Sequence, residues 1–500
     1  MKRDIKTIIL LITMLVLSQV LTANIASKKL LINDKRDDFD PLVDIAVSVD
    51  IQKIRSLEKE DRQLRVSEVI DTTTDPDFYL KVFINQEEFI SPVWDNIKYI
   101  YDPQWCATLD VPDDVEFVSV RIQLWDAQDE TSDSDRLCDI SGDYDITEDS
   151  FDVELDYSIK TGHWSGDDYL DHDPETADPS GYGRLNGCDD GTIYQQDRDC
   201  EVWFAISQND YDDDGIPYWT EVNVFETDPM INNTGEDVDN DDIPIEWEWK
   251  WGYDPLSSDN HDSLDPEDDG LNNYEEYLTS QWYSDPFRDD LFIELDQMQQ
   301  SPQGQDNLLP DGSKEILTTA YDRYNLVYHL DDGSMGGGEM IPFDEDSDYN
   351  DLYNIYMTYF LHGDVHHWRR GIFHYGVVIY STEIAAGAAF GPNRFFIQST
   401  YHEQKASSPF IGWLLDRDTI YASAVMHETG HTFGYNPIGG HNRWSLYPWQ
   451  FGWWYWRPYK SCMNYGYMYT TVDYSDGSRG NRDYNDWTRM DLSYFEQEWH

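Results

Sequence analysis

The chain has 500 residues, of which 99 are Asp or Glu and 34 are Lys or Arg, so its formal net charge at pH 7 is -65. That charge argues against nucleic acid or an anionic membrane as a direct partner, because both would need bridging cations. The 40% hydrophobic and 15% aromatic content excludes a disordered acidic protein. At about 100 to 200 residues per domain the length predicts roughly three domains. Either calcium loading or adaptation to a salt-rich environment would explain the acidity.

The N-terminus has the pattern of a secretory signal peptide at residues 1–26. Basic residues precede an apolar run from Ile8 to Leu17, and small residues follow at Ala23 and Ala26. The run is shorter than the about 20 residues of a membrane span, so cleavage is expected, with an uncleaved anchor as the alternative. No later segment has the length and apolarity of a span. The mature chain is therefore expected to be secreted, and to be extracellular or associated with a cell surface.

The sequence has five cysteines, and export to an oxidising compartment permits disulfides. Cys188 and Cys200 are close enough in sequence to staple a loop. Cys106 and Cys138 form a second candidate pair, which leaves Cys462 over. These pairings are predictions from spacing.

Residues 40–208 alternate between short strand-like runs and turns rich in Asp, Gly and Pro. The runs are VDIAVSVDI, FYLKVFI, VEFVSVRIQLW and CEVWFAI, whose β-branched and aromatic residues predict an antiparallel all-β sandwich. Acids cluster in the turn before FYLKVFI and in the turn after VRIQLW, where they could form a cup of calcium ligands. The candidate ligands are Asp71, Asp77, Asp126, Asp129 and Asp135. The alternative is an acidic sandwich with solvated loops that binds no calcium.

The stretches DPDFYLKV and LWDAQDETSDSDRLCDISG, with Trp94 between them, resemble the C2-type calcium and phospholipid binding module. The second Asp cluster has one residue more than that module, and residues 160–200 do not fit it. The resemblance implies a calcium-dependent contact with a surface or a lipid through this domain.

Residues 209–287 contain a calcium-loop pattern three times. Each copy has acids at positions 1, 3, 5 and 12, which is the EF-hand ligand spacing, and the copies start at residues 210, 237 and 265. Glycine suits position 6, where the chain turns sharply; Gly215 and Gly270 follow this rule and Asp242 departs from it. The predicted ligands are Asp210, Asp212, Asp214 and Glu221; Asp237, Asp239, Asp241 and Glu248; and Asp265, Glu267, Asp269 and Glu276.

A TDP, YDP or SDP turn follows each copy. With these turns the repeat resembles the bacterial and archaeal form of thrombospondin type 3 repeats, which implies a calcium-stiffened spacer. Without the ion the closely spaced carboxylates repel one another, so this segment is expected to loosen when calcium is removed.

Residues 288–500 predict a domain of the α/β or α+β class. DDLFIELD, NLVYHL, FHYGVVIY and NRFFIQST are strand candidates, and SKEILTTAYDRY is a helix candidate. A second helix, RDTIYASAVMHETGHT, has Ile420, Ala424, His427 and His431 on one face and is expected to end at Gly434. NDWTRMDLSYF is expected to form a closing amphipathic helix.

The stretch HETGH at 427–431 is a zinc-binding motif, because histidines four residues apart share one face of a helix. A chance match in a chain with 13 histidines has a probability of roughly 2%. This motif, Gly434, and the later SCMNYGYMY with Met463 and Tyr465 resemble the metzincin metalloproteases, in particular their pappalysin-like branch. The resemblance implies one catalytic zinc, with Met463 beneath the metal and Tyr465 near the oxyanion.

The third zinc ligand departs from the family pattern. Its usual place, three residues after the glycine, holds Pro437, which cannot bind a metal. We expect His441 to bind instead, because Gly439 and Gly440 allow a longer loop to return it to the same point. Asn436 is a poorer ligand than imidazole. The remaining alternative is that His441 is a surface histidine and the site is incomplete.

Given three imidazoles, zinc lowers the pKa of water towards 7, and Glu428 is placed to take the water's proton. We therefore expect a zinc metalloendopeptidase, stabilised by several calcium ions, that hydrolyses peptide bonds of extracellular proteins. The alternative is a calcium-dependent cell-surface binding or adhesion protein with an inactive protease-like domain. Retention of Glu428 favours the enzyme, because an inactive site has no need of a general base.

Two features near the motif leave alternatives open. The stretch WSLYPWQFGWWYWRPYK either lines a substrate cleft or packs a large loop onto the core. Cys462 is either a buried hydrophobic residue beside the turn or a thiol that competes for zinc.

Overall fold

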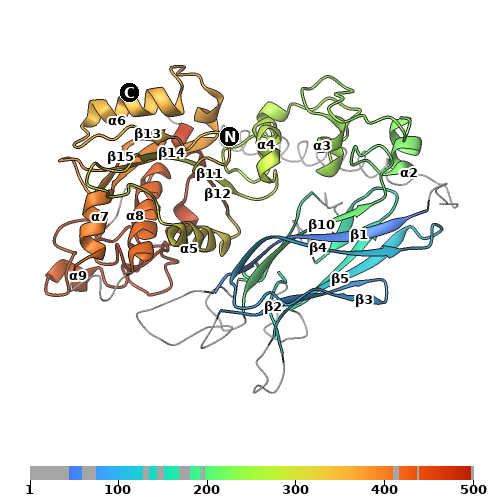
Figure 1. The fold of residues 1–500 in the computed structure, drawn as a ribbon, viewed down its shortest axis with the longest axis horizontal. Coiled ribbons are helices and arrows are strands. Elements are labelled where there is room, and N and C mark those ends of the chain that lie inside the picture. The colour runs from blue at the N-terminus through green and yellow to red at the C-terminus, as the bar shows by residue number, and fades with distance from the viewer. Residues whose placement is uncertain are drawn as a thin grey trace, which may run out of the picture. The chain divides into compact units, whose positions relative to one another are not determined.

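The computed structural model describes residues 44–58, 75–127, 135–142, 151–167, 181–191, 193, 198–408, 416–435 and 439–496. The chain forms two compact units that divide between Asp259 and Asn260 (Figure 1). The predicted signal peptide at residues 1–26 lies outside the described residues. Within those residues, no helix is long and apolar enough to cross a bilayer.

The first unit contains a β-sandwich of two antiparallel sheets. One sheet has the order β4-β1-β10-β9, and the other has the order β3-β2-β5-β7-β8 with β6 paired to β5. Inward side chains of both sheets make one apolar core, to which Val49 and Val82 belong. The strands are β1 (Ala46–Ser56), β2 (Phe78–Ile84), β3 (Glu87–Ile90), β4 (Tyr99–Asp110), β5 (Phe117–Asp126), β6 (Arg136–Leu137), β7 (Val153–Ser158), β8 (Trp164–Gly166), β9 (Gly183–Asn186) and β10 (Cys200–Gln208).

The predicted all-β class of this segment is confirmed. The four runs identified from the sequence appear as β1, β2, β5 and β10, and β2 pairs directly with β5. Strand β4 was not predicted, because this edge strand buries only two of its twelve residues and contains Pro103.

No disulfide joins the cysteines, all five of which lie in the described residues. The predicted Cys106–Cys138 pair is wrong, because Cys106 is exposed on β4 whereas Cys138 is buried in the sandwich core. The predicted Cys188–Cys200 pair is also wrong. The Cys188 thiol donates to Oδ2 of Asp199 at 3.3 Å, and the Cys200 thiol is hydrogen bonded with that of Cys138. Sequence spacing could not reveal these neighbours, because β-sheet topology rather than chain proximity brings them together.

The first two calcium-loop repeats complete the first unit and pack on the sandwich. Trp249 Nε1 donates to the Thr161 carbonyl at 2.9 Å, and the Thr220 hydroxyl donates to the Lys160 carbonyl at 2.5 Å. The third repeat belongs to the second unit, so the predicted spacer at 209–287 is divided between the two units. The helices of the repeats are α2 (Tyr218–Thr220), η2 (Glu221–Phe225), α3 (Ile245–Lys250), η3 (His261–Ser263), α4 (Asn273–Thr279) and η4 (Ser280–Trp282).

A mixed sheet forms the centre of the second unit, in the order β12-β11-β14-β16-β15, with β13 also paired to β11. All neighbouring pairs are parallel except β15 with β16. Helices α5 and α8 cover one face and α6 covers the other (Figure 1), which gives the unit two apolar cores. The elements are β11 (Asp290–Met298), α5 (Asp311–Asp322), β12 (Val327–Asp331), β13 (Met340–Ile341), α6 (Tyr349–Ile355), η5 (Tyr356–Phe360), η6 (Trp368–Gly371), β14 (Phe373–Ile379), β15 (Gly387–Gly391), β16 (Arg394–Gln398), α7 (Ser399–Ala406), α8 (Arg417–Thr432), α9 (Phe451–Tyr455), η7 (Trp487–Arg489) and η8 (Leu492–Glu496).

The strands and two helices predicted for 288–500 are present as β11, β12, β14, β16, α5 and α8. The expected closing helix is wrong. NDWTRMDLSYF instead forms the short 3₁₀ segments η7 and η8, because Met490 between them is extended, with φ −59° and ψ 132°.

Candidate metal centres

Helix α8 carries two of the three histidines that converge in the second unit. The Asp416 side chain caps its N-terminus by accepting a hydrogen bond from the Thr419 amide at 2.7 Å. The helix packs in the core beneath the sheet, which leaves His427 only 2% exposed. The helix ends at Thr432, and Gly434 has a φ of +74°, so the chain turns where the sequence predicts.

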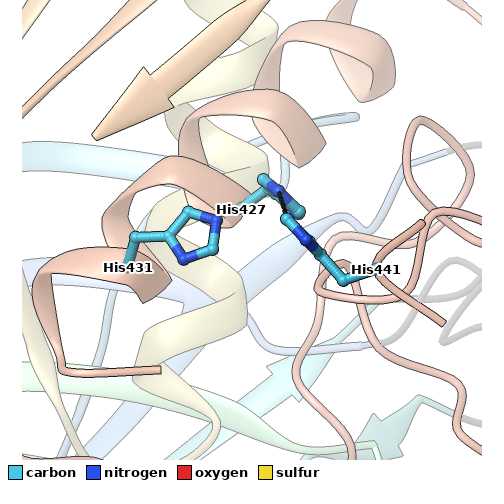
Figure 2. Close-up of side chains that lie close together, drawn as sticks. All are labelled: His427, His431 and His441. Carbon is cyan, nitrogen blue, oxygen red and sulfur yellow. Dashed lines mark hydrogen bonds between the residues drawn. The ribbon is translucent and has the colours of Figure 1, made fainter. Parts of the chain in front are cut away.

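The three predicted zinc ligands lie together (Figure 2). One ring nitrogen from each of His427, His431 and His441 lies within 4.8 Å of the others. The Nε2 atoms of His427 and His441 are 3.2 Å apart, close to the about 3.3 Å of two ligands on a tetrahedral zinc with Zn–N bonds of about 2.0–2.1 Å. The intervening Asn436 and Pro437 lie outside the described residues.

Backbone carbonyls orient the two helix histidines. His427 Nδ1 lies 2.8 Å from the carbonyl of the buried Cys462, and His431 Nδ1 lies 3.0 Å from that of Tyr435. A proton on each Nδ1 leaves Nε2 as the metal-binding atom. Burial and the neighbouring imidazoles lower the pKa of His427 well below its usual value, and burial first, then His431, lowers that of His441 to about 4. Neutral imidazoles oriented in this way fit zinc.

Two glycines allow the loop to return His441 to the helix. A Cβ on Gly439 would lie 2.2 Å from the Trp456 ring, and a Cβ on Gly440 would lie 2.4 Å from Oδ1 of Asn464. The φ of Gly440 is +78°, which also favours glycine. Asn464 packs against Gly440 and is itself held in place, since its Nδ2 donates to the carbonyls of Trp456 and Tyr459 at 3.1 and 2.8 Å. The sequence did not predict a role for this asparagine, and its only signal was its position in the Met-containing turn.

Glu428 is a buried acid next to the histidines. It is 3% exposed, and burial raises its pKa to about 8 although the Ala389 backbone donates a hydrogen bond to it. Its Oε2 has no hydrogen-bond partner among the described residues. Gly387 of β15 packs against it, because a Cβ there would lie 2.6 Å from Oε1. In its ionised form this carboxyl group can accept a proton from a water at the site.

Met463 packs against α8, and Tyr465 lies beside the histidines. Met463 is fully buried, and a Cβ on Gly430 of α8 would lie 2.6 Å from its Sδ. The Tyr465 ring centroid is 4.3 Å from that of His441. Burial and the Glu428 carboxylate raise the pKa of Tyr465, which keeps its hydroxyl protonated near neutral pH.

Most of the aromatic stretch after His441 lies at the surface. Trp444, Trp449 and Phe451 are 77%, 79% and 83% exposed, whereas Tyr459 is buried. Packing onto the core therefore describes Tyr459 but is wrong for these three rings.

The three calcium loops share one hydrogen-bond pattern. In each loop the carboxylate at position 1 accepts the backbone N–H groups of positions 4 and 6, and the carboxylate at position 5 accepts that of position 7, at 2.7–3.2 Å. The second oxygen of position 5 accepts an N–H from a later segment, at Asn233, Asp259 and Asp290 respectively. Ligand atoms from positions 1, 3 and 5 of each loop lie within 4.8 Å of one another. The sequence repeat is therefore also a structural repeat.

Asp242 keeps the backbone conformation of the glycine that it replaces. Its φ is +76°, compared with +83° at Gly215 and +95° at Gly270. This left-handed conformation costs about 1–2 kcal/mol for a residue with a Cβ. The departure seen in the sequence thus leaves the loop geometry intact.

Several loop carboxylates lack protein partners. Both oxygens of Asp212, Glu267 and Glu276 have no hydrogen-bond partner among the described residues, and Glu276 is fully buried. Burial raises the pKa of Glu221 to about 7 and that of Glu267 to about 10. Desolvated carboxylates this close together need either a proton or a compensating cation, and calcium takes six to eight oxygen ligands of this kind.

The acids of the sandwich gather at one end of the second sheet. Asp77 precedes β2 and its amide donates to the carboxylate of Asp126, the last residue of β5, at 3.0 Å. Asp135 precedes β6 and accepts a hydrogen bond from the Tyr79 hydroxyl at 2.9 Å. The other two predicted ligands, at positions 71 and 129, lie outside the described residues.

No protein-family model matches the sequence, and no curated protein matches it. The chain is similar to solved structures, several of which are described as C2 domains. A structure of a C2 domain is 12% identical, with 33% of this chain and 98% of that chain covered and a TM-score of 0.18. A C2 domain of plant extended synaptotagmin 1 is 10% identical, with 34% and 97% covered and a TM-score of 0.19. Human GIVD cytosolic phospholipase A2 is 10% identical, with 33% of this chain but 17% of that chain covered and a TM-score of 0.18. TM-scores this low do not establish a shared fold, so the sandwich is assigned from its own strand pairing.

Proposed function

We propose that the chain is a secreted zinc endopeptidase of metzincin type, stabilised by calcium, that cleaves extracellular proteins. The observation that carries the proposal is the return of His441 to His427 and His431 across a loop longer than the family pattern. Zinc held by three imidazoles lowers the pKa of water towards 7 and polarises a peptide carbonyl.

The residues around the histidines suit peptide hydrolysis. Glu428 holds a proton from water at Oε2 and returns it to the leaving amine. The protonated Tyr465 hydroxyl is available to donate to an oxyanion beside His441. Met463 packs under α8 and supports the helix that carries the other two histidines.

The edge strand β15 suits the binding of an extended peptide. It ends the strand order of its sheet, so within the described residues one side of its backbone pairs with no strand. Residues 387–389 are Gly, Ala and Ala, and small side chains let a peptide backbone approach. Main-chain hydrogen bonds to such an edge would lay the substrate beside Glu428, which Gly387 and Ala389 contact.

The test is zinc content by elemental analysis together with casein cleavage in calcium buffer. Wild type should carry one zinc and cleave, His441→Ala should lose both, and Glu428→Gln should keep zinc and lose cleavage. A His441→Ala protein that keeps zinc and activity would contradict the assignment of the third ligand. A wild type with neither would contradict the proposed enzyme.

A second candidate function is a calcium-dependent contact with a cell surface or a lipid. The acids gathered at one end of the sandwich, at Asp77, Asp126 and Asp135, and the three calcium loops favour it. This contact would accompany proteolysis, or would be the only function if the protease domain is inactive. Binding to cells or vesicles that requires calcium and survives Glu428→Gln would support it.

A further inference from the structure

The chain leaves the central sheet of the second unit between β12 and β13. β11 pairs with β12 as far as Glu294, opposite Asp331, and pairs with β13 from Gln297 onwards. The excursion at 332–339 is glycine-rich, and it covers the side chain of Glu294. A Cβ on Gly337 would lie 2.4 Å from Oε2 of Glu294.

Four carboxyl groups meet under this excursion with one guanidinium group. Glu294, Asp296 and Asp331 are all 0% exposed, and Glu339 ends the excursion. Arg369 Nε lies 2.5 Å from Oε2 of Glu294, and Nη2 of the same arginine forms an ion pair with Asp331. One positive charge therefore faces four carboxyl groups. If all four carboxyl groups are ionised, the cluster has a formal charge of −3 that must be compensated.

Asp331 is satisfied by its surroundings. Besides Arg369, it accepts the backbone N–H groups of Gly333, Met335 and Gly337 at 3.1, 2.8 and 2.8 Å. Its carboxylate thus organises the excursion, and the uncompensated charge lies with the other three acids.

Two of those three acids present an oxygen that the protein does not satisfy, and the third, Asp296, lies against one of them. Oε1 of Glu294 and Oε2 of Glu339 are buried and have no hydrogen-bond partner among the described residues. Asp296 accepts the Tyr375 hydroxyl at 2.6 Å and the Glu339 amide at 2.7 Å, yet its carboxyl group also lies within hydrogen-bonding reach of the Glu339 carboxyl group. Two carboxylates in contact require a shared proton or a cation.

We propose that Glu294, Asp296 and Glu339 form a further calcium site, separate from the three loops and independent of the proposed protease function. The donors are all oxygen, which suits calcium rather than zinc, and calcium tolerates irregular geometry better than magnesium does. Bound calcium would fasten the excursion at 332–339 to β11.

The test counts calcium ions bound per chain by equilibrium dialysis of the full-length protein. Glu339→Gln is the first variant because this residue lies on the excursion and is partly exposed. Glu345→Gln, at an exposed acid six positions later, is the matched control. We expect Glu339→Gln to bind one ion fewer than wild type and the control to match wild type. Asp296→Asn should show the same loss, with folding of each variant checked by circular dichroism. Equal numbers of ions in wild type and both variants would overturn the site and leave a shared proton as the compensation.

A second inference concerns the aromatic loop, defined as residues 443–457. Its exposed rings include Trp444, Trp449, Phe451 and Trp454, the last 57% exposed. Between Glu428 and Asp473 the sequence has no Asp or Glu, although 99 of the 500 residues of the chain are acidic. The positive charges there are Arg443, Arg457 and Lys460, and the Arg482 guanidinium lies 3.7 Å from the centroid of the Tyr455 ring.

We infer that the aromatic loop inserts into the headgroup region of an anionic lipid bilayer. Trp and Tyr prefer this interface, and arginine and lysine are attracted to its negative surface. The absence of acids removes locally the repulsion that the net charge of the chain would impose. The rings are exposed to solvent. This suits insertion into a bilayer better than binding of one substrate side chain, which would require a buried pocket.

The test is co-sedimentation with phosphatidylcholine vesicles that contain or lack phosphatidylserine. Wild type should bind the vesicles with phosphatidylserine, and the double variant W449S/F451S should bind about tenfold more weakly. The control Y349S/Y353S removes two exposed tyrosines of α6 and should bind as wild type does. Equal binding by wild type and the loop variant would overturn the inference. Loss of self-association instead of lipid binding in the loop variant would assign the loop to a second copy of the chain.

Discussion

Replacement of Gly440 by alanine tests how the loop delivers His441 to the candidate zinc site. Gly440 has a φ of +78°, and a Cβ there would lie 2.4 Å from Oδ1 of Asn464. The new methyl group therefore strains the backbone and pushes on the Asn464 side chain that packs against the loop.

The magnitude follows from those two effects. The left-handed conformation costs about 1–2 kcal/mol with a Cβ present. Moving Asn464 weakens its two hydrogen bonds to the carbonyls of Trp456 and Tyr459, each with a net contribution of about 1 kcal/mol. Without zinc the loop can relax and avoid most of this cost, whereas bound zinc requires His441 in place. We therefore expect at least about 2 kcal/mol to appear as weaker zinc binding, which is about 30-fold in Kd.

The assay is zinc affinity by competition with a chromogenic chelator, together with thermal unfolding of the metal-free protein. Gly480→Ala is the matched control, because Gly480 has a φ of +90° and nothing within 4 Å of an added Cβ. The control should keep wild-type zinc affinity. Unchanged affinity in Gly440→Ala, or an equal loss in both variants, would refute the role given to the loop.

Three further predictions concern buried acids. Glu428→Gln should retain zinc and lose about 10²- to 10⁴-fold in casein cleavage, because the proton acceptor is removed while the imidazoles remain; zinc content and rate are measured on one preparation. Glu276→Gln should reduce the calcium-induced rise in melting temperature, by calorimetry, since calcium at about 100 times its Kd contributes about 2.7 kcal/mol at each site. Glu201→Gln should destabilise the sandwich by about 3 kcal/mol at pH 7, because burial opposes the charge of Glu201 but Arg184 and Lys53 outweigh it and lower its pKa from 4.5 to about 2. In urea unfolding this difference should be full above pH 4.5 and vanish as the pH falls towards 2; a difference independent of pH would contradict the assignment to charge.

Local patterns predicted the parts of the structure that depend on neighbours in the chain. The helical spacing of His427 and His431, the left-handed end at Gly434 and the repeating acids of the calcium loops all follow from residues within one or two turns. The position of His441 next to these two histidines was also predicted, because glycines beside a histidine allow a loop to turn back towards the helix.

Parts that depend on distant contacts were missed or wrong. Asn464 lies against Gly440 because the carbonyls of residues 456 and 459 hold it there, and Ala389 reaches Glu428 only through the sheet. The cysteine pairs failed for the same reason, since Cys138 meets Cys200 through strand topology. The carboxylates beneath the excursion at 332–339 have no regular spacing in the sequence, so the sequence could not predict that they cluster.

The placement of the acids bears on why the chain carries so many of them. Adaptation to salt favours carboxylates that are exposed and hydrated, whereas the repeat acids Asp214, Glu221, Glu248, Asp269 and Glu276 are between 0% and 5% exposed. Burial of a charge is unfavourable by several kcal/mol per ion, and a buried side chain gains nothing from hydration. A bound cation accounts for their burial, and this favours calcium loading as the reason for the acidity of the repeats.

We therefore expect calcium to restore the melting temperature of chelator-treated protein. Sodium chloride at any concentration should restore little of the melting temperature, because screening by salt does not reach buried carboxylates. Full recovery in sodium chloride without calcium would assign the repeats to salt adaptation instead.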